Sequence, residues 1–385
     1  MSDFAIIYLY IGKAMNKRSH YLGHSDQCVV IGMSGGVDSS VAAYLLKEEG
    51  WRVIGVTMKL WPQDCMSRAQ DKCCGPQAIA DARGVAHALG IPHYVIDEAS
   101  PFEELVINYF SEEYKLGRTP NPCIMCNEKL KFGNLWTKAT ALGANYIATG
   151  HYAIVEHTEG KATLRRGLDE TKDQSYFLFS LRQPQLQRAL CPLGKLTKKE
   201  IRSLARQLGL KVAEKEDSQE ICFVPGKDYK AFLKERGDVF HPGGFYDVEG
   251  NYLGEHDGIE LFTIGQRKGL PGGSPYPRYV VDIDAEQKRV ILGRESDLLC
   301  QEFQVDRLNW LEAIPSSRKE VTVRVRHGHQ GASATIHVDN NETARVCLSA
   351  PLRAVTPGQA AVFYDKDLVL GGGWIASSQM ITQAT

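Results

Sequence analysis

The sequence predicts an α/β protein with an N-terminal doubly wound parallel sheet, a small β-rich central domain and a C-terminal β-barrel. A chain of 385 residues has room for two or three domains. Apolar strands alternate with helical segments over 29–149, which is typical of a parallel sheet. Short β segments with Gly and Pro turns fill 228–295, and alternating strands over 303–374 indicate a barrel.

These patterns divide the chain into four segments. They are an N-terminal extension 1–27, the α/β domain 28–226, the central domain 227–297 and the barrel 298–385. Within the extension, Met15 is an alternative start.

The composition is that of a globular protein, with 43% apolar residues, 24% charged residues and a net charge of −1. A nucleic-acid surface would therefore have to be a local basic patch. Residues 4–11 are apolar, but they lack a basic leader and are too short to span a bilayer, so we expect a cytoplasmic protein. Ten cysteines are too few for a disulfide scaffold, so we expect reduced thiols that serve chemistry.

The first strand, 29–31, leads into a loop that reads Ser34-Gly35-Gly36-Val37-Asp38-Ser39, and a helix is expected over 41–49. Glycines allow positive φ, and the N–H groups of such a loop and of the helix N-terminus can hold an anion. The loop lacks a Gly-Lys-Ser/Thr ending and the Gly-x-Gly-x-x-Gly spacing, which excludes two common phosphate loops. It resembles the pyrophosphate loop of enzymes that cleave ATP to AMP and pyrophosphate. The alternative is an ordinary turn in which Asp38 or Ser39 caps the helix.

Further elements follow in order along the chain. Ser100 is expected to cap a helix that ends near Leu116, two prolines bar a helix over 118–127, and Asn127 is expected to cap the next helix. The expected strands are 53–58, 93–96, 146–149, 163–166, 175–180 and 220–225, and the expected helices are 77–89, 101–116, 128–142 and 197–208.

Basic residues gather around the helix 197–208. They are Arg188, Lys195, Lys198, Lys199, Arg202, Arg206 and Lys211. A solvated helix face and a phosphate-contacting patch are equally good interpretations of this cluster.

Four motifs then belong together: the pyrophosphate loop, Asn121-Pro122-Cys123-Ile124-Met125-Cys126-Asn127, Gly150-His151-Tyr152 and Asp217-Ser218-Gln219-Glu220-Ile221-Cys222. As a set they closely resemble the tRNA-uridine 2-sulfurtransferases (2-thiouridylases), from about residue 28 to about residue 380. The resemblance implies an ATP-pyrophosphatase domain that uses ATP and Mg²⁺ to adenylate the C2 oxygen of the wobble uridine. The ATP-binding residues it implies are Gly32, Met33, Ser34, Gly35, Gly36, Val37, Asp38, Ser39, Met58 and Gly150.

The resemblance also implies the sulfur chemistry. Cys222 would carry a persulfide and Cys126 would act as the second thiol, so that sulfur transfer leaves a Cys126–Cys222 disulfide. A helix N-terminus just after Cys126 would favour its thiolate. Taken alone, Cys222 would be interpreted as a buried small hydrophobe in a strand.

The partners implied are the tRNA anticodon loop and a sulfur-donor protein carrying persulfide, with the chain expected to be a monomer. The implied contacts to the target base and the tRNA are Asn121, Pro122, Cys123, His151, Lys172, Asp173, Gln174, Arg326, His327 and Gln359.

Cys123 departs from the family, in which many members have Asp at this position. Three thiols, Cys123, Cys126 and Cys222, could instead hold a [4Fe–4S] cluster. The persulfide relay and the cluster both stay open, and the three-cysteine pattern favours the cluster slightly. Structural zinc, held by Cys123 and Cys126 with Cys73 or Cys74, is a third interpretation.

Two other functions compete with tRNA thiolation. One is an ATP-pyrophosphatase ligase or amidotransferase for a small molecule, which would need neither a barrel nor paired cysteines. The other is a non-catalytic tRNA-binding protein with a degenerate loop, which the intact hexad at 34–39 argues against.

Overall fold

The structure is a computed structural model that describes residues 27–60, 75–216, 221–224, 226 and 228–380. Several expectations lie outside these residues. They concern the extension and Met15, the cysteines at 73 and 74, and the motif residues 217–220.

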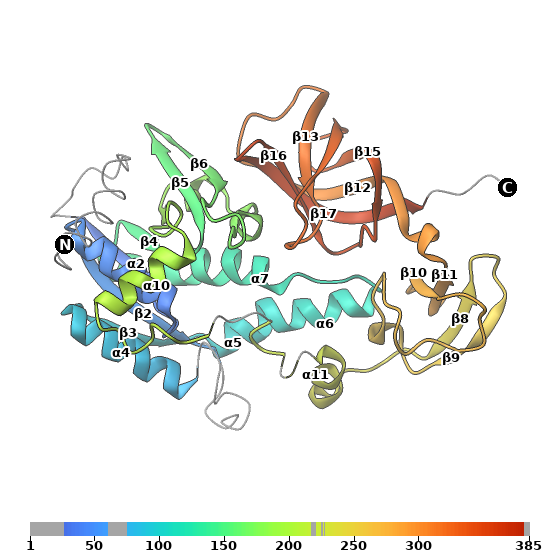
Figure 1. The fold of residues 1–385 in the computed structure, drawn as a ribbon, viewed down its shortest axis with the longest axis horizontal. Helices are drawn as coiled ribbons and strands as arrows, with labels where there is room; N and C mark the ends of the chain where they lie inside the picture. Colours follow the sequence, from blue (N-terminus) through green and yellow to red (C-terminus); the bar gives the residue numbers. More distant parts are fainter. Residues whose placement is uncertain (1–26, 61–74, 217–220, 225, 227, 381–385) are drawn as a thin grey trace. The chain divides into compact units, whose positions relative to one another are not determined.

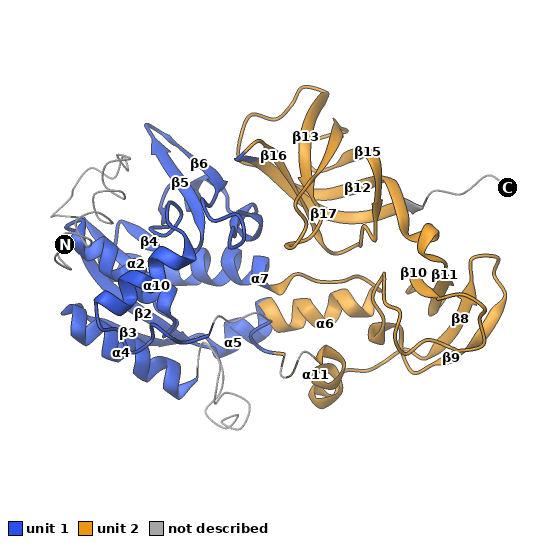
Figure 2. Ribbon diagram, viewed as in Figure 1, with its two compact units in different colours: residues 1–105, 123–223, 367–369 blue, residues 106–122, 224–366, 370–385 orange. Residues whose placement is uncertain are grey.

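The chain forms two compact units (Figure 2). Unit 1 comprises residues 1–105, 123–223 and 367–369, and unit 2 comprises 106–122, 224–366 and 370–385.

Unit 1 is built on a sheet of five parallel strands in the order β3-β2-β1-β4-β7, which confirms the predicted parallel α/β domain (Figure 1). The strands are β1 (Cys28–Gly32), β2 (Arg52–Lys59), β3 (His93–Asp97), β4 (Tyr146–Ala148) and β7 (Ala189–Leu190). Because side chains alternate along a strand, Val29 and Ile31 of β1 point to the same face of the sheet. There they share one core cluster with Val53 and the buried residues of three helices.

These three helices are α2 (Val37–Glu48), α4 (Pro76–Leu89) and α10 (Lys198–Gln207). Helix α4 has Pro76 in its first turn and ends at Gly90 with φ 63°, a conformation that glycine adopts without strain. Helix α10 has the predicted capping box, in which Thr197 and Glu200 bond each other's backbone N–H. Helix α2 begins four residues before the expected start, with Gly36 as its N-cap. The alternative in which Asp38 or Ser39 caps it is therefore wrong, and both lie in its first turn.

The helix predicted from Ser100 to Leu116 is present, but its cap is wrong. The chain runs through α5 (Ala99–Phe102), a π-helical stretch η2 (Glu103–Ile107) and α6 (Asn108–Lys115). Ser100 lies inside α5, because the Asp97 carboxylate accepts the Ala99 N–H and the helix starts earlier.

Two of the predicted strands are absent from the described residues. Residues 175–178 form a 3₁₀ helix, η4 (Ser175–Leu178), because the Asp173 carboxylate accepts the Ser175 N–H and tightens the turn. Residues 222–224 have turn and bend geometry, and no strand is present among the described residues of the segment 220–225, where one was expected. The strand expected over 163–166 is the second half of a hairpin, β5 (Ala153–Thr158) and β6 (Lys161–Arg166), which extends away from the parallel sheet (Figure 1).

Unit 2 contains two β structures. The central sheet has the order β10-β11-β8-β9 and packs around Phe245, Val280 and Leu292. Its strands are β8 (Gly243–Asp247), β9 (Tyr252–His256), β10 (Tyr279–Asp284) and β11 (Arg289–Gly293), preceded by helix α11 (Tyr229–Arg236).

The second structure is the predicted C-terminal barrel, closed by antiparallel pairing of its first and last strands, β12 and β17. Its strands are β12 (Leu299–Trp310), β13 (Arg318–Arg324), β14 (Ala332–Val338), β15 (Ala344–Arg353), β16 (Ala360–Asp365) and β17 (Leu368–Met380). The first residues of β17 belong to unit 1, where Leu368 pairs with Arg165 of β6. No helix among the described residues is long and apolar enough to cross a membrane.

Candidate active site

The predicted anion loop connects β1 to α2 at the carboxyl end of the parallel strands. Ser39 Oγ accepts a hydrogen bond from the Ser34 N–H at 3.2 Å and donates to the Gly36 carbonyl at 3.2 Å. Ser40 Oγ also donates to the Gly36 carbonyl, at 2.8 Å. These bonds fold the chain back on itself at the N-terminus of α2, where the N–H groups of a loop and of a first helical turn can hold an anion.

Two glycines in this region have no room for a side chain. Gly35 has φ 67°, and a Cβ atom on it would lie 2.2 Å from the Ala78 carbonyl oxygen. A Cβ on Gly150 would lie 2.9 Å from the backbone nitrogen of Ser39. Gly150 is therefore placed directly against the loop, although it is more than a hundred residues away in sequence.

The Asp38 carboxylate is bonded within unit 1. Tyr152 OH donates to Oδ1 at 2.6 Å, and Lys198 Nζ donates to Oδ1 and Oδ2 at 2.8 and 2.9 Å. Lys198 therefore does not belong to a solvated helix face, since its side chain is 11% exposed. A carboxylate beside a phosphate loop is also a suitable ligand for the Mg²⁺ that accompanies ATP.

The floor of the loop is fixed by the neighbouring strand β2. Thr57 Oγ1 donates to the Met33 carbonyl at 2.7 Å and shares a hydrogen bond of 2.9 Å with His93 Nε2. Burial, with a smaller contribution from the charge of Arg83, lowers the pKa of His93. Met58, the next residue of β2, is half-buried at the carboxyl end of the strand, where ligands of open α/β sheets bind.

Cys123 and Cys126 lie in a helix, which corrects the expectation that two prolines would bar one. Helix α7 (Pro122–Met125) continues through the π-helical η3 (Cys126–Asn134) into α8 (Leu135–Ala141). A helix can start at Pro122 because its first N–H groups have no intrahelical partner. The N-terminus therefore precedes both cysteines, and Asn127 is no cap: its side chain donates to the Phe177 carbonyl at 3.1 Å. Their spacing of three puts the exposed Cys123 and the half-buried Cys126 on one helix face.

Cys222 is half-buried in the turn at 222–224, which contradicts its expected place in a strand. Within the described residues no three His, Cys, Asp or Glu side chains are grouped so that they could hold a metal ion. In the part of the chain that the structure describes, Cys123, Cys126 and Cys222 are therefore not grouped as the ligands of a [4Fe–4S] cluster would be. The zinc interpretation needs Cys73 or Cys74, which lie outside the described residues.

Several residues of unit 1 that were expected to contact the tRNA form hydrogen bonds within the unit. His151 is buried and shares a hydrogen bond of 2.7 Å with Thr149 Oγ1; burial, followed by the charge of Lys131, holds its pKa well below the ordinary range. The buried Asp173 accepts the N–H groups of Gly167 and Ser175, each at 3.0 Å. Gln174 Oε1 accepts the Tyr152 N–H at 3.0 Å, and Lys172 is half-buried.

The expected contacts of unit 2 lie in the barrel and in the segment before Cys123. Arg326 and His327 are exposed. Gln359 Nε2 donates to the carbonyls of Thr119 and Pro120 at 3.0 and 3.1 Å, and thereby holds the chain that leads to the buried Asn121 and to Pro122.

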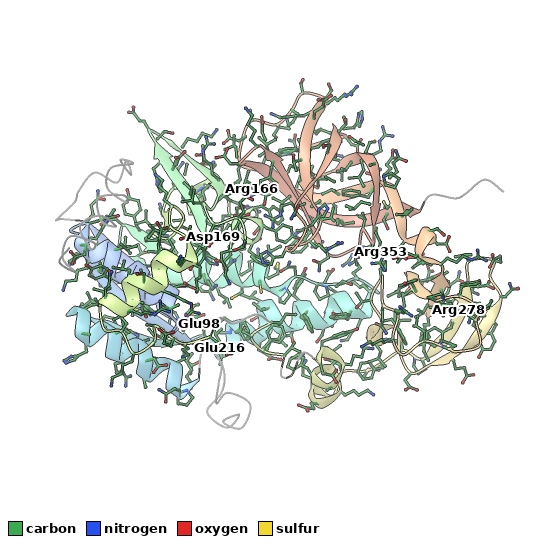
Figure 3. All side chains as sticks on the ribbon, viewed as in Figure 1. Glu98, Arg166, Asp169, Glu216, Arg278 and Arg353 are labelled. Atoms are coloured by element: carbon green, nitrogen blue, oxygen red, sulfur yellow. The ribbon has the colours of Figure 1, made fainter. Side chains whose placement is uncertain are left out.

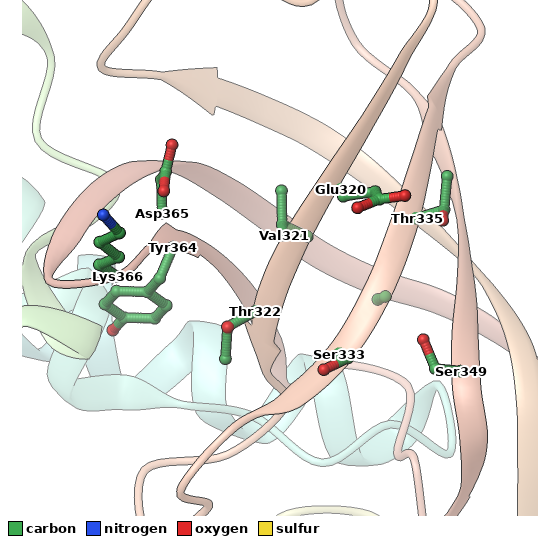
Figure 4. Close-up of a pocket in the computed structure, with 10 residues that line it drawn as sticks. Glu320, Val321, Thr322, Ser333, Thr335, Ser349, Tyr364, Asp365 and Lys366 are labelled. Atoms are coloured by element: carbon green, nitrogen blue, oxygen red, sulfur yellow. The ribbon is translucent and has the colours of Figure 1, made fainter.

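The barrel also has a hollow of about 410 Å³ on its surface (Figure 4). It is lined by small hydroxyl side chains of neighbouring strands, among them Thr322, Ser333 and Ser349. Its lining contains none of the residues that the sequence predicted for the site.

From the sequence, Tyr152 and Lys198 were named without their bonds to Asp38, and Lys215 was not singled out. Lys215 Nζ donates to the Gly35 carbonyl at 3.1 Å and to Asp81 Oδ2 at 2.8 Å. The sequence contains one signal for Lys198. A lysine at the first position of a helix opposes the helix dipole, so its presence there indicates a specific interaction. The Lys198 N–H is held by Asp169, at 2.9 Å (Asp169 is labelled in Figure 3).

A parallel sheet that carries a Ser-Gly-Gly-x-Asp-Ser loop at its carboxyl edge defines a nucleotide-binding protein of the ATP-pyrophosphatase class. Comparison with known families agrees with this class and extends it. Residues 27–226 match the tRNA methyl transferase HUP domain, residues 230–294 the tRNA methyl transferase PRC-barrel domain, and residues 300–375 the aminomethyltransferase beta-barrel domain.

The relatives narrow the class to one family. The chain is 50% identical over 356 residues to tRNA-specific 2-thiouridylase MnmA 1 of Caldanaerobacter subterraneus, which covers 90% of this chain and 97% of the relative. It is 49% identical over 355 residues to tRNA-specific 2-thiouridylase MnmA of Heliobacterium modesticaldum, covering 91% and 92%. The chain belongs to the tRNA-specific 2-thiouridylase family, as its motifs indicated.

Among solved structures, the chain is similar to the U34-tRNA thiolase NcsA of Methanococcus maripaludis with its [4Fe–4S] cluster, at 19% identity. The match covers 61% of this chain and 74% of that one, with a TM-score of 0.38. So low a score does not carry the cluster over to this chain.

Proposed function

We propose that the chain is a tRNA-uridine 2-sulfurtransferase that converts the wobble uridine of tRNA to 2-thiouridine, with release of AMP and pyrophosphate. The observation that carries the proposal is the preformed phosphate loop at 34–39, in a chain that is about half identical to 2-thiouridylases over nine-tenths of its length. The proposal includes a cytoplasmic enzyme that acts as a monomer.

The loop binds the phosphates of ATP through the backbone N–H groups around Ser34 and Ser39. Met58 and Gly150 contact the nucleotide, and Asp38 contributes a ligand to Mg²⁺. The uridine C2 oxygen attacks the α-phosphorus, and pyrophosphate leaves. Donors fixed in advance around the leaving pyrophosphate stabilise the charge that develops on it. The C2 oxygen, a poor leaving group in uridine, becomes part of AMP.

Sulfur then enters from a persulfide on Cys222, loaded by a donor protein. The terminal sulfur attacks C2 and AMP leaves, so that the base is joined to Cys222 through two sulfur atoms. The Cys126 thiolate attacks the Cys222 sulfur, which breaks that sulfur–sulfur bond and releases 2-thiouridine. A Cys126–Cys222 disulfide remains, and an external thiol reductant must reopen it.

The tRNA presents the uridine from its anticodon loop, since an unstacked base is the form in which proteins reach reactive atoms. Asn121, Pro122 and Cys123 face the target base at the start of α7. Arg326 and His327, both exposed on the barrel, contact the tRNA, as do Lys172 and the region of His151.

Cysteine variants of the full chain test the sulfur path. The proposal expects C126S and C222S to release pyrophosphate in the presence of tRNA but to form no 2-thiouridine, whereas C123S keeps thiolation. Protein prepared without oxygen should carry no iron and should accept sulfur from a persulfide donor. Iron and labile sulfide that disappear in C123S, C126S and C222S alike would contradict the relay.

A further inference from the structure

Lys198, one of the basic residues around α10, bonds the acidic residue of the phosphate loop. Lys198 Nζ lies 2.8 and 2.9 Å from the two carboxylate oxygens of Asp38, and it is also 5.8 Å from the ring centroid of Tyr152. Asp38 is in the first turn of α2, next to the N–H groups that receive phosphate. An anionic carboxylate at that place repels a polyphosphate unless a cation compensates it.

We infer that Lys198 is a built-in counter-cation of the phosphate loop, which cancels the charge of Asp38 so that the loop binds ATP before a divalent cation arrives. Lys198 acts through Asp38 and is a positioning residue. The inference rests on the proposed function, which places the phosphates of ATP at this loop.

The position of Lys198 is unfavourable in free energy, and several hydrogen bonds offset this. A cation at the first position of α10 opposes the helix dipole, and a long side chain loses rotamer freedom when it is buried. The backbone at this position is fixed by the bond from the Lys198 N–H to Asp169 and by the capping box of Thr197 and Glu200. The Asp38 carboxylate stabilises the buried Lys198 ammonium, because both of its oxygens accept charge-assisted hydrogen bonds from Nζ.

Lys199 provides a matched control. It has the same side chain on the same helix turn, but it is exposed. A role of the basic cluster in general would make K198M and K199M equivalent, whereas a role through Asp38 would separate them.

The test measures binding of ATP to the full chain by calorimetry, once in EDTA and once with saturating Mg²⁺. Wild type, K199M and D38N should bind ATP in EDTA. K198M should bind it about tenfold to a hundredfold more weakly, which is the range of a charge-assisted hydrogen bond. Mg²⁺ should restore most of the affinity of K198M, because the metal compensates the same carboxylate.

The double variant D38N/K198M separates a charge effect from a structural one. If Lys198 acts by cancelling Asp38, removing the carboxylate should restore ATP binding in EDTA to within a few-fold of D38N, and K198R should keep most of the wild-type affinity. Equal ATP affinity of wild type and K198M in EDTA, or no binding by wild type without Mg²⁺, would overturn the inference. Failure of wild type to bind ATP even with Mg²⁺ would contradict the proposed function itself.

Discussion

At the scale of single residues, the phosphate loop combines residues that the sequence shows together with residues that it keeps far apart. Residues 34–39 form a recognisable hexad, because a loop that binds phosphate needs small and hydroxyl side chains at neighbouring positions. Lys198, which bonds Asp38, is 160 residues further along the chain. The unfavourable place of Lys198 at the start of a helix indicates that it has a partner, but a single sequence does not identify that partner, because the pairing depends on how α10 packs against α2 in the folded unit.

The first prediction concerns Asp38. D38A should abolish pyrophosphate release in the presence of tRNA and Mg²⁺, because it removes the acidic ligand from the loop. It should also destabilise the fold by roughly 1–3 kcal/mol, since it leaves the nearly buried Lys198 without its carboxylate at a place that is partly open to water. Pyrophosphate assays and urea unfolding measure the two effects. D38N, which keeps an oxygen acceptor, is the control and should lose less stability; wild-type turnover by D38A would refute the assignment.

A second residue-scale prediction follows from His151. Burial keeps the pKa of His151 low in the folded state. Near pH 6.5 the imidazole of the unfolded chain therefore binds a proton, whereas the buried imidazole of the folded chain stays neutral. The free energy of unfolding should therefore fall as the pH drops below about 6.5, by up to about 1.4 kcal/mol per pH unit from this group. In H151Q the slope should be shallower by that amount. Unfolding midpoints at a series of pH values would show equal slopes if the account is wrong.

At the scale of secondary-structure elements, the periodic segments were predictable and their ends were not. Four strands of the parallel sheet, β1 to β4, and the helix α10 with its capping box agree with the sequence pattern, whereas the short edge strand β7 was not predicted. The predicted cap at Ser100 was wrong, because the Asp97 carboxylate accepts the Ala99 N–H and the helix begins before Ser100. The helix at Pro122 was missed because proline was treated as a breaker at a place where it can begin a helix.

Two glycines, one in the phosphate loop and one in α4, give a matched element-scale prediction. G35A should destabilise the chain by roughly 2–4 kcal/mol and weaken ATP binding, because the backbone is left-handed and a Cβ would meet the Ala78 carbonyl. G84A, an exposed helix position with open space around it, should stabilise the chain by about 0.5–1 kcal/mol. Thermal unfolding of both variants checks the pair; similar effects of the two substitutions would contradict the assignment of Gly35 to a close approach.

Gln359 allows a test of how unit 2 holds the segment before Cys123. Q359A should increase hydrogen exchange over residues 117–121, because it removes two bonds to that segment, worth about 1–3 kcal/mol. The remaining bond from the Thr119 N–H to the Pro357 carbonyl should then open more often. The exposed Gln330 is the matched control. The measurement contains no RNA, so unchanged exchange in Q359A would leave Gln359 with a role in RNA contact only.

At the scale of the whole molecule, charge is nearly balanced, and tRNA binding must come from local patches. Three basic residues around α10 are bonded within the chain, which leaves fewer of them for contact with tRNA. Lys198 bonds Asp38, Arg202 bonds the Ala213 and Lys215 carbonyls, and Arg206 pairs with Glu214. Lys199 and Lys211 are exposed. Reversing the charge of Lys198 would disturb Asp38 and the phosphate loop, so only the exposed lysines can report on contact with tRNA.

The revised prediction uses the two exposed lysines. In K199E/K211E the slope of log K against log salt for tRNA should become shallower by about 1.4–1.8, if each lysine contacts one phosphate. K288E makes the same charge change in the turn between β10 and β11 and should leave the slope unchanged. Binding titrations at several salt concentrations measure both; equal slopes in all three proteins would show that α10 is merely solvated.

The central claim is that one chain couples ATP cleavage at the 34–39 loop to thiolation of a tRNA base. The most direct measurement incubates the purified chain with tRNA, Mg²⁺, ATP and a persulfide donor, then quantifies nucleosides by mass spectrometry alongside AMP and pyrophosphate. The account predicts 2-thiouridine at the wobble position, one AMP and one pyrophosphate for each, and no 2-thiouridine with C126S or C222S. Formation of AMP with a small-molecule acceptor in the absence of tRNA, or full thiolation by C222S, would contradict it.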